Sequence, residues 1–411
     1  MPSPEWFGME DAIARLLPSG GISPDRALLL EKLSLYATVA VREARSMQHT
    51  IPTPVETAHA LSWLRRPLFI CGHHRSGTTL LQQLLDWHPQ LVVLPSEGTY
   101  FSSFNYVART HPAPRDIDRF IADWIARLID PNHPPHFKLG RSGQDGCPSV
   151  HFARRLLEWQ AALLRTRPSL GRFSPLLALV AAYKDAALSR TTPCLWVEKT
   201  PLNEIHVHRF ADFSEARFIQ MVREPEATLA SLLEQLRAVG ARDLDVFARA
   251  NRIRRSFRLA RTHTQQYRDR YLVVRYEDLT DHPAREMERV RAFLGIAPDP
   301  ILSTPTVGGC AVRSNSSFVQ SDSGLVLRSR HSSVLSPAEL RLVNVLTASA
   351  ARPFGYDIGH LPALTRCAIQ IRRFDAFRRI WVSTYRILRS VAQILAPARL
   401  VAICKSYRTR G

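Results

Sequence analysis

Residues 72–79 read GHHRSGTT and combine two glycines, three hydroxyl side chains and one arginine. An apolar run precedes this turn and a helical pattern follows it, so its backbone N–H groups would converge on an anion at a helix N-terminus. The spacing of the glycines is that of a P-loop, yet Thr78 stands where a nucleoside triphosphatase needs lysine. The turn therefore predicts that the protein binds a phosphate group but does not react at the γ-phosphate of ATP or GTP. The alternative is an ordinary strand-to-helix turn.

Two further charged residues stand where apolar runs end. Glu97 closes the segment that begins with residues 91–94, and Lys199 closes the run that begins at residue 194. The carboxyl ends of parallel strands meet at the edge of an α/β sheet that faces ligands. Because Lys199 is one of only five lysines, it is the candidate for the cation that the turn lacks. A surface lysine is the alternative interpretation.

A second anion site is indicated by Arg223 and Ser231. Residues 217–222 have the pattern of a strand, Arg223 follows at its carboxyl end, and Ser231 lies about two turns into the next helical segment. A guanidinium and a hydroxyl group at the same strand–helix junction can share one phosphate. The pair is a weak pattern alone, and it gains weight because it follows the first turn along the chain.

Residues 69–81 and 84–89 resemble the 5′-phosphosulfate loop of sulfotransferases that use 3′-phosphoadenosine 5′-phosphosulfate (PAPS). The similarity is to the bacterial and Golgi-type branch, whose loop reads PRSGTT, and His74 replaces the usual proline. Residues 196–201 are similar to the family's EKTP strand end, and residues 313–318 to its late nucleotide loop. The resemblance implies a donor site formed by Arg75, Ser76, Gly77, Thr78, Thr79, Leu80, Arg223, Ser231, Asn315 and Ser316.

The resemblance also implies the chemistry, which is in-line transfer of a sulfuryl group from PAPS to a hydroxyl. Such a reaction needs a base for the acceptor and cations where negative charge develops, and Arg75 and Lys199 would supply the cations. Glu97 is the expected base, since related tyrosine-sulfating enzymes have a glutamate at nearly this distance beyond the loop. His73 or His74 is the alternative base. No metal is expected, because the leaving group is a phosphate already bound by the loop.

These residues require a sheet to position them. Apolar runs at 68–71, 91–94, 194–197, 217–222 and 271–274 alternate with helical segments and predict a mostly parallel sheet. The expected fold is α/β, a P-loop-like three-layer arrangement with helices on both sides of the sheet. Residues 276–278 also resemble the family, and we interpret them as structural, fixing a turn before the next helix.

The chain divides by composition into three parts. Residues 1–66 predict a helical N-terminal cap, and residues 67–360 the sulfotransferase domain. Within that domain, residues 104–190 predict a helical insertion that shapes the acceptor region, while the Ser/Gly-rich stretch 308–333 predicts a binding loop. Residues 361–411 form a basic amphipathic tail. The tail either packs on the catalytic domain or lies on an anionic membrane.

Composition limits the remaining classes of function. The chain has 411 residues, 45% of them hydrophobic, and a net charge of +19 that favours anionic partners. The six cysteines form no CxxC pair, and the sequence shows no signal-peptide pattern and no apolar run of about 18 residues. These observations predict a cytoplasmic enzyme. The expected partner is a carbohydrate, glycolipid or other small acceptor, and no nucleic acid. The competing hypotheses are a P-loop kinase or NTPase, and an anion-binding module for membrane or nucleic acid.

Overall fold

All five apolar runs that predict strands belong to one sheet, whose order is β2-β3-β1-β4-β5. Every neighbouring pair in this sheet is parallel. The structure is a computed structural model, and it describes residues 9, 12–13, 25–105, 107–109, 112–131, 138–140, 147–188, 192–210, 213–238, 244–312 and 334–357. The strands are β1 (Pro67–Gly72), β2 (Leu91–Glu97), β3 (Leu195–Lys199), β4 (Arg217–Val222) and β5 (Tyr271–Arg275).

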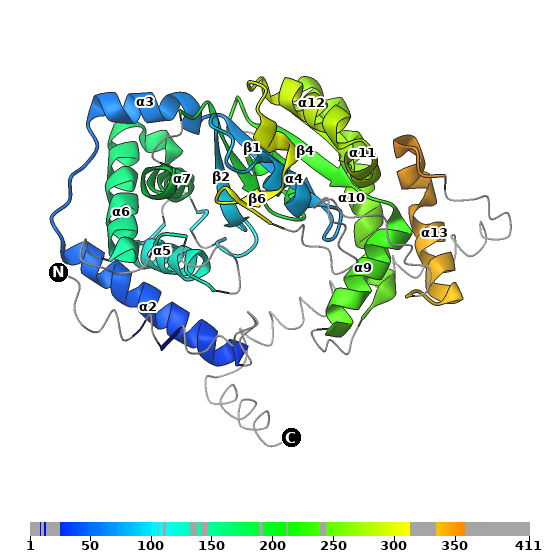
Figure 1. Cartoon of the computed structure of the whole chain (residues 1–411), viewed down its shortest axis with the longest axis horizontal. Coiled ribbons are helices and arrows are strands. Elements are labelled where there is room, and N and C mark those ends of the chain that lie inside the picture. Colours follow the sequence, from blue (N-terminus) through cyan, green and yellow to red (C-terminus); the bar gives the residue numbers. More distant parts are fainter. Residues whose placement is uncertain are drawn as a thin grey trace, which may run out of the picture.

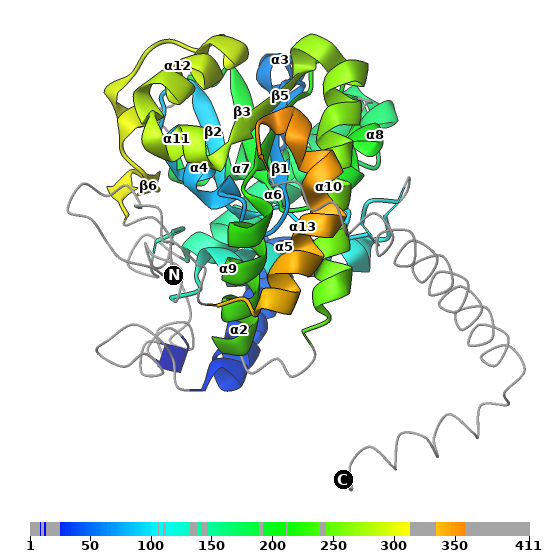
Figure 2. The ribbon, with the colours of Figure 1, turned by 90° about the vertical axis from the view of Figure 1, so that its right-hand side faces the viewer.

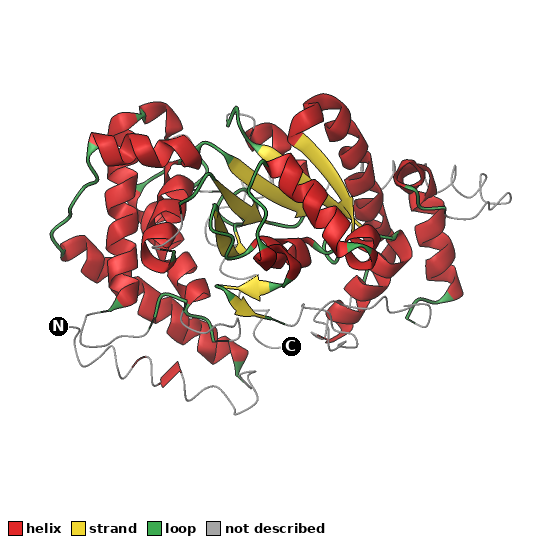
Figure 3. Cartoon of the chain, turned by 45° about the horizontal axis from the view of Figure 1, so that its top comes forward, coloured by secondary structure: helices red, strands yellow, loops and turns green. Residues whose placement is uncertain are grey.

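The sheet is the middle layer of three, and alternate residues of β1 point to opposite layers. Leu68 and Ile70 belong to one hydrophobic cluster, and Phe69 and Cys71 belong to another. Both faces of the sheet are therefore buried, which explains why its strands are continuous apolar runs rather than alternating ones. The predicted α/β fold with helices flanking a parallel sheet is confirmed (Figure 1, Figure 3).

Helices of the C-terminal half cover the sheet and extend beyond its β5 edge. Helices α9, α10 and α13 pack side by side (Figure 2). A short antiparallel hairpin of β6 (Thr306–Val307) and β7 (Cys310–Ala311) lies apart from the main sheet. Helix α4 (Thr78–Leu85) follows β1, and the helices of the C-terminal half are α8 (Val207–Phe210), α9 (Pro225–Ala238), α10 (Val246–Tyr267), α11 (Tyr276–Asp281), α12 (Pro283–Leu294) and α13 (Pro337–Ala351). Short 3-10 turns occur at Asn203–Ile205, Arg268–Arg270, Pro300–Ser303 and Arg352–Phe354.

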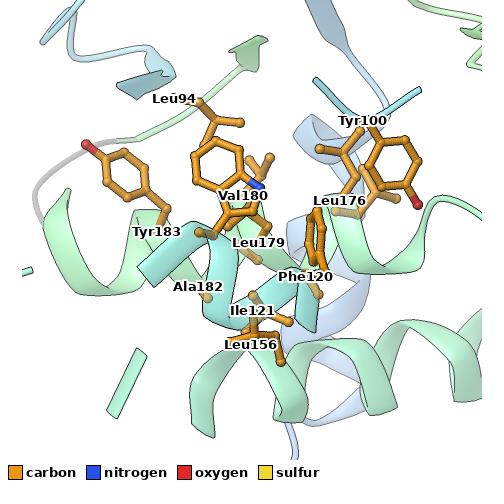
Figure 4. Close-up of a cluster of buried hydrophobic side chains, with 14 of the residues drawn as sticks. Leu94, Tyr100, Phe120, Ile121, Leu156, Leu176, Leu179, Val180, Ala182 and Tyr183 are labelled. Atoms are coloured by element: carbon orange, nitrogen blue, oxygen red, sulfur yellow. The ribbon is translucent and has the colours of Figure 1, made fainter. Parts of the chain in front are cut away.

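The predicted N-terminal cap and helical insertion pack against each other beside the sheet. The cap contains α2 (Arg26–Ser46) and α3 (Pro54–Leu64). The insertion contains α5 (Pro114–Leu128), α6 (Pro148–Thr166), a 3-10 turn at Pro168–Leu170 and α7 (Ser174–Ala187). Helix α2 lies against both α5 and α6 (Figure 1). Their shared core contains Phe120, Leu156 and Leu176 (Figure 4).

Strand β2 ends at Glu97, as predicted, with a shift in its register against β3 between Val93 and Glu97. Helix α4 ends at Leu85. One local prediction needs correction. Residues 276–278 are not a turn before a helix, because α11 begins at Tyr276 itself.

Two further expectations concern regions at or beyond the limits of the description. Of the predicted binding loop 308–333, the structure describes only the part up to residue 312, which lies in the hairpin. The basic tail, residues 361–411, lies outside the described residues. Among the residues that the structure describes, no helix has both the length and the apolar character needed to cross a bilayer.

Candidate active site

The turn at residues 72–79 connects β1 directly to α4. Both the backbone N–H and the side-chain hydroxyl of Ser76 donate to the carbonyl of His73, at 3.1 and 2.6 Å. Gly77 has a φ of +95°, and a Cβ there would lie 2.4 Å from the ring of Tyr276. A side chain at this position would therefore be strained and would clash, so the turn requires glycine. The first N–H groups of a helix have no partner within that helix, so an anion can accept from those at the start of α4.

A buried carboxylate holds the start of the turn. Glu204, only 1% exposed, accepts from the backbone N–H of Gly72 at 3.0 Å and from the hydroxyl of Ser256 at 2.6 Å. Burial raises the pKa of Glu204, and these hydrogen bonds oppose the rise. Because Ser256 belongs to α10, one side chain ties the turn to a distant helix. Sequence analysis missed Glu204, since nothing local distinguishes it from a surface glutamate.

The two predicted halves of the donor site meet at Arg75. Its Nε donates to the hydroxyl of Ser231 at 2.9 Å, and its carbonyl accepts from Arg223 at 3.1 Å. The guanidinium carbon of Arg223 lies 4.4 Å from the ring centre of Tyr276, the residue that also packs on Gly77. Burial, and then the charge of Arg223, lower the pKa of Arg75. Two cations this close favour an anion between them.

The predicted base and cation form an ion pair. The ammonium of Lys199 donates to Glu97 Oε1 at 2.9 Å, and the register shift in β2 places the two residues opposite each other. The side chain of Lys199 is 5% exposed, whereas that of Glu97 is 42% exposed. Arg127 of α5 donates to the backbone carbonyl of Glu97 at 2.6 Å. Lys199 is therefore a buried functional candidate rather than a surface lysine, and its partner is open to the cavity.

A second buried glutamate lies behind this pair. Glu198 accepts from the backbone N–H of Gly98 at 2.8 Å, from the amide of Asn203 at 2.8 Å, and from the hydroxyl of Thr200. Burial raises the pKa of Glu198 to about 7, although these hydrogen bonds oppose the rise. Thr200 in turn accepts from the backbone N–H of Thr99 at 2.8 Å. The residues that follow Glu97 are thus tied to the end of β3.

The two histidines of the turn differ in their surroundings. His73 is buried, its Nδ1 lies 2.9 Å from the carbonyl of His74, and burial lowers the pKa of its imidazole to about 4. His74 is exposed. Desolvation lowers the pKa of His74 while the charge of Glu97 opposes this. Of the two alternative bases, His74 alone is open to solvent.

The other predicted site residues are placed as follows. Thr78 is buried, whereas Thr79 is half-buried and faces a cavity. The side chain of Leu80 packs in the hydrophobic core, so only its backbone is left to meet a donor. Asn315 and Ser316 lie outside the described residues. Among the described residues, no group of histidine, cysteine, aspartate and glutamate side chains could hold a metal ion.

A cavity of about 930 Å³ opens beside the ion pair. Glu97, Lys199 and Thr79 line one part of it, and residues of α2 and α5 line the opposite side. This volume is at the upper end of the range for small-molecule sites. The Glu97–Lys199 pair, the turn after β1 and the cavity therefore share one edge of the sheet.

These features define an α/β protein whose turn after the first strand could hold an anion. A sequence model of the sulfotransferase family matches residues 67–300, more than half of the chain. The protein belongs to the sulfotransferase family. No curated protein sequence matches it.

Several solved structures resemble the chain. The sulfotransferase domain of the Synechococcus PCC 7002 olefin synthase is 19% identical, with a TM-score of 0.34, covering 80% of this chain and 98% of the domain. The sulfotransferase domain from the curacin biosynthetic pathway is 18% identical, with a TM-score of 0.37, and the match covers 73% of this chain and 100% of that domain. Sulfotransferase STF9 of Mycobacterium avium is 15% identical, with a TM-score of 0.33, and the match covers 74% of this chain and 86% of STF9. At scores this low, family membership rests on the sequence match.

Proposed function

We propose that this enzyme transfers the sulfuryl group of PAPS to a hydroxyl of a carbohydrate, glycolipid or other small acceptor. The observation that carries the proposal is the Glu97–Lys199 pair, which lines the same cavity as Thr79 of the anion-binding turn. A base, a cation and a phosphate-binding backbone at one edge of the sheet are what sulfuryl transfer needs.

The residues of the turn fit the donor's two anionic ends. The N–H groups at the start of α4, the Thr78 and Thr79 hydroxyls and Lys199 would bind the 5′-phosphosulfate. Arg223 and Ser231 would bind the 3′-phosphate, and Arg75, which contacts both in this structure, would lie between the two ends. The late loop with Asn315 and Ser316 would complete the site.

Glu97 would act as the base. As the acceptor oxygen forms a bond to sulfur, its proton passes to the Glu97 carboxylate and the sulfur–oxygen bond to the phosphate breaks. The bonding electron pair leaves on the phosphate oxygen, where Lys199 and Arg75 would stabilise the charge. The exposure of Glu97 supports this role, because a base must be reachable by the acceptor. His74 is the alternative base.

Binding of adenosine 3′,5′-bisphosphate in the presence of EDTA tests the proposal. Calorimetry should show tight binding of the bisphosphate without Mg²⁺ and no binding of ATP. A kinase or NTPase would instead bind ATP with Mg²⁺, and Thr78 at the position of the P-loop lysine argues against that activity. Labelled PAPS incubated with enzyme and cell extract, followed by mass spectrometry, would then identify the acceptor.

For the cellular location we propose a cytoplasmic enzyme, on the basis of its cysteine usage. The tail from Leu361 carries ten arginines and one lysine against one aspartate. This positive charge supports contact with an anionic membrane. The alternative is that the tail packs on the catalytic domain. The full chain should sediment with anionic but not neutral vesicles, and less at high salt. If a chain ending near residue 360 sediments equally, the tail is not the cause.

A further inference from the structure

The wall that α4 contributes to the cavity has two polar ends. Thr79, Gln82, Gln83 and Asp86 line the cavity at the spacing of one helical face. Thr79 is at the donor end of this face, beside Lys199 and Glu97. Asp86, the residue that caps the helix, lies seven residues further on, about 10 Å along the helix axis. Groups at that second end are too far from the donor end to take part in the transfer, so we consider a different role for them.

Lys138 lies near the second end, where the charges of Asp86 and Asp130 act on it. Lys138 lines the cavity, and no carboxylate of the described residues lies within ion-pair distance of its ammonium. Burial lowers the pKa of Lys138 to about 8, while the carboxylates of Asp130 and Asp86 oppose the drop. Lys138 therefore brings hydrogen-bond donors to a partly buried place where nothing in the described chain uses them.

Gln83 is a second polar group at the same end. It is 8% exposed and lines the cavity, yet its Oε1 accepts no hydrogen bond among the described residues. This oxygen is covered in the structure, so a ligand reaches it only when the Gln83 side chain rotates towards the cavity that it lines. Pairing with a ligand would then remove the cost of a buried unpaired amide. The neighbouring Gln82 differs, because its amide donates to the carbonyl of Leu94 at 2.5 Å.

The charges at this end nearly balance. Asp130 accepts two hydrogen bonds from Arg26, at 2.9 and 2.6 Å, which neutralises that carboxylate. Asp86 accepts from the hydroxyl of Thr306 at 2.9 Å and from the N–H of Gly309 at 3.1 Å, and burial raises its pKa. An anionic ligand would meet Asp86, and a cationic one would meet Lys138. An alkyl chain would leave Lys138 and Gln83 unpaired.

A hydroxyl group both donates and accepts, so hydroxyls can satisfy Lys138, Gln83 and Asp86 together. We propose that Gln83, Asp86 and Lys138 form a second subsite that binds a neutral, hydroxyl-bearing part of the acceptor, about 10 Å from the donor end. The acceptor is then a neutral polyol with hydroxyls at both ends, rather than a lipid alcohol, a phenol or an anion. This inference rests on the proposed function and specifies its substrate.

Saturation-transfer NMR on the protein loaded with adenosine 3′,5′-bisphosphate tests the subsite. The probes are the neutral disaccharide maltose, its singly oxidised anionic form maltobionate, and 1-hexanol. Maltose should bind, and the other two should bind at least tenfold more weakly. In Lys138→Met and in Gln83→Leu the dissociation constant of maltose should rise at least tenfold. Lys184→Met is the matched control, since that half-buried lysine on α7 does not line the cavity, and it should leave maltose binding unchanged.

Melting temperature and bisphosphate affinity show whether each variant is folded, and either folded variant is sufficient for the test. The inference is overturned if maltose does not bind the wild-type protein, if a folded variant binds it as well as wild type does, or if hexanol or maltobionate binds as tightly as maltose or more tightly. Each of these results, obtained while the bisphosphate still binds, leaves the proposed sulfotransferase activity standing. Failure of the wild-type protein to bind the bisphosphate contradicts that activity instead.

Discussion

The guanidinium Nε of Arg75 donates to the hydroxyl of Ser231 at 2.9 Å, although the two residues are 156 positions apart in the chain. One belongs to the turn after β1, and the other to α9 after β4. The contact joins two motifs that the sequence presents separately, and both belong to the donor site that we propose. Arg223 also donates to the backbone carbonyl of Arg75, so Arg75 contacts both residues of the second motif.

Arg75→Ala should weaken bisphosphate binding by about 1.5–3 kcal/mol, which is 10- to 150-fold, because a charged hydrogen-bond donor is lost. Calorimetry measures this directly. Arg258→Ala is the matched control, since Arg258 is exposed on α10 and should leave the affinity unchanged. An Arg75→Ala protein that folds normally and binds the bisphosphate as tightly as wild type would show that Arg75 is not a donor ligand.

Glu97→Gln should lower turnover by about 10²- to 10⁴-fold, because glutamine keeps the shape of the side chain but cannot accept the proton. Donor affinity should be nearly unchanged. The measurement is kcat with labelled PAPS, together with bisphosphate affinity. If His74→Ala abolishes turnover while Glu97→Gln retains it, the base is His74.

Gly77→Ala should prevent donor binding and lower the melting temperature. The added Cβ would lie 2.4 Å from the ring of Tyr276, and the φ of +95° is unfavourable for alanine. Gly295→Ala separates these two causes, because Gly295 has a φ of +67° but no atom within 4 Å of its missing Cβ. The control should lose only about 1 kcal/mol of stability and keep donor binding. Equal losses in both variants would mean that the contact with Tyr276 does not matter.

Glu198→Gln should change how stability depends on pH. The carboxyl pKa of Glu198 is about 7 in the folded protein against an ordinary value of 4.5. Between these pH values the folded state holds a proton that the unfolded state has lost, so this group makes stability fall as pH rises from 4.5 to 7. Glutamine does not titrate. The variant should therefore gain about 3 kcal/mol relative to wild type across that interval, whatever its stability at pH 4.5.

Urea unfolding at pH 4.5 and at pH 7 measures both proteins. A stability difference between them that stays constant with pH would mean that Glu198 is ionised in the folded protein with its ordinary pKa. The mutation also removes one acceptor from the group formed by Gly98, Thr200 and Asn203. Its effect at pH 4.5 reports that loss separately.

The sequence by itself determined the sheet and the first turn. Strands of a parallel sheet are buried on both faces, so β1, β4 and β5 stand out as apolar runs wherever they occur. The turn is equally local, because glycines and hydroxyls within eight residues suffice to form it. Both features depend on neighbours along the chain, and a pattern in the chain therefore reveals them.

Only the tertiary structure decided which side chains meet. The bulge in β2 that places Glu97 opposite Lys199 depends on pairing between strands about a hundred residues apart. Glu198 and Glu204 look like surface glutamates in the sequence, yet both are buried where backbone N–H groups need an acceptor. Lys138 likewise gains its place in the cavity from packing of the helical region. The energy of such groups comes from burial and from distant partners, and neither leaves a periodic pattern in the chain.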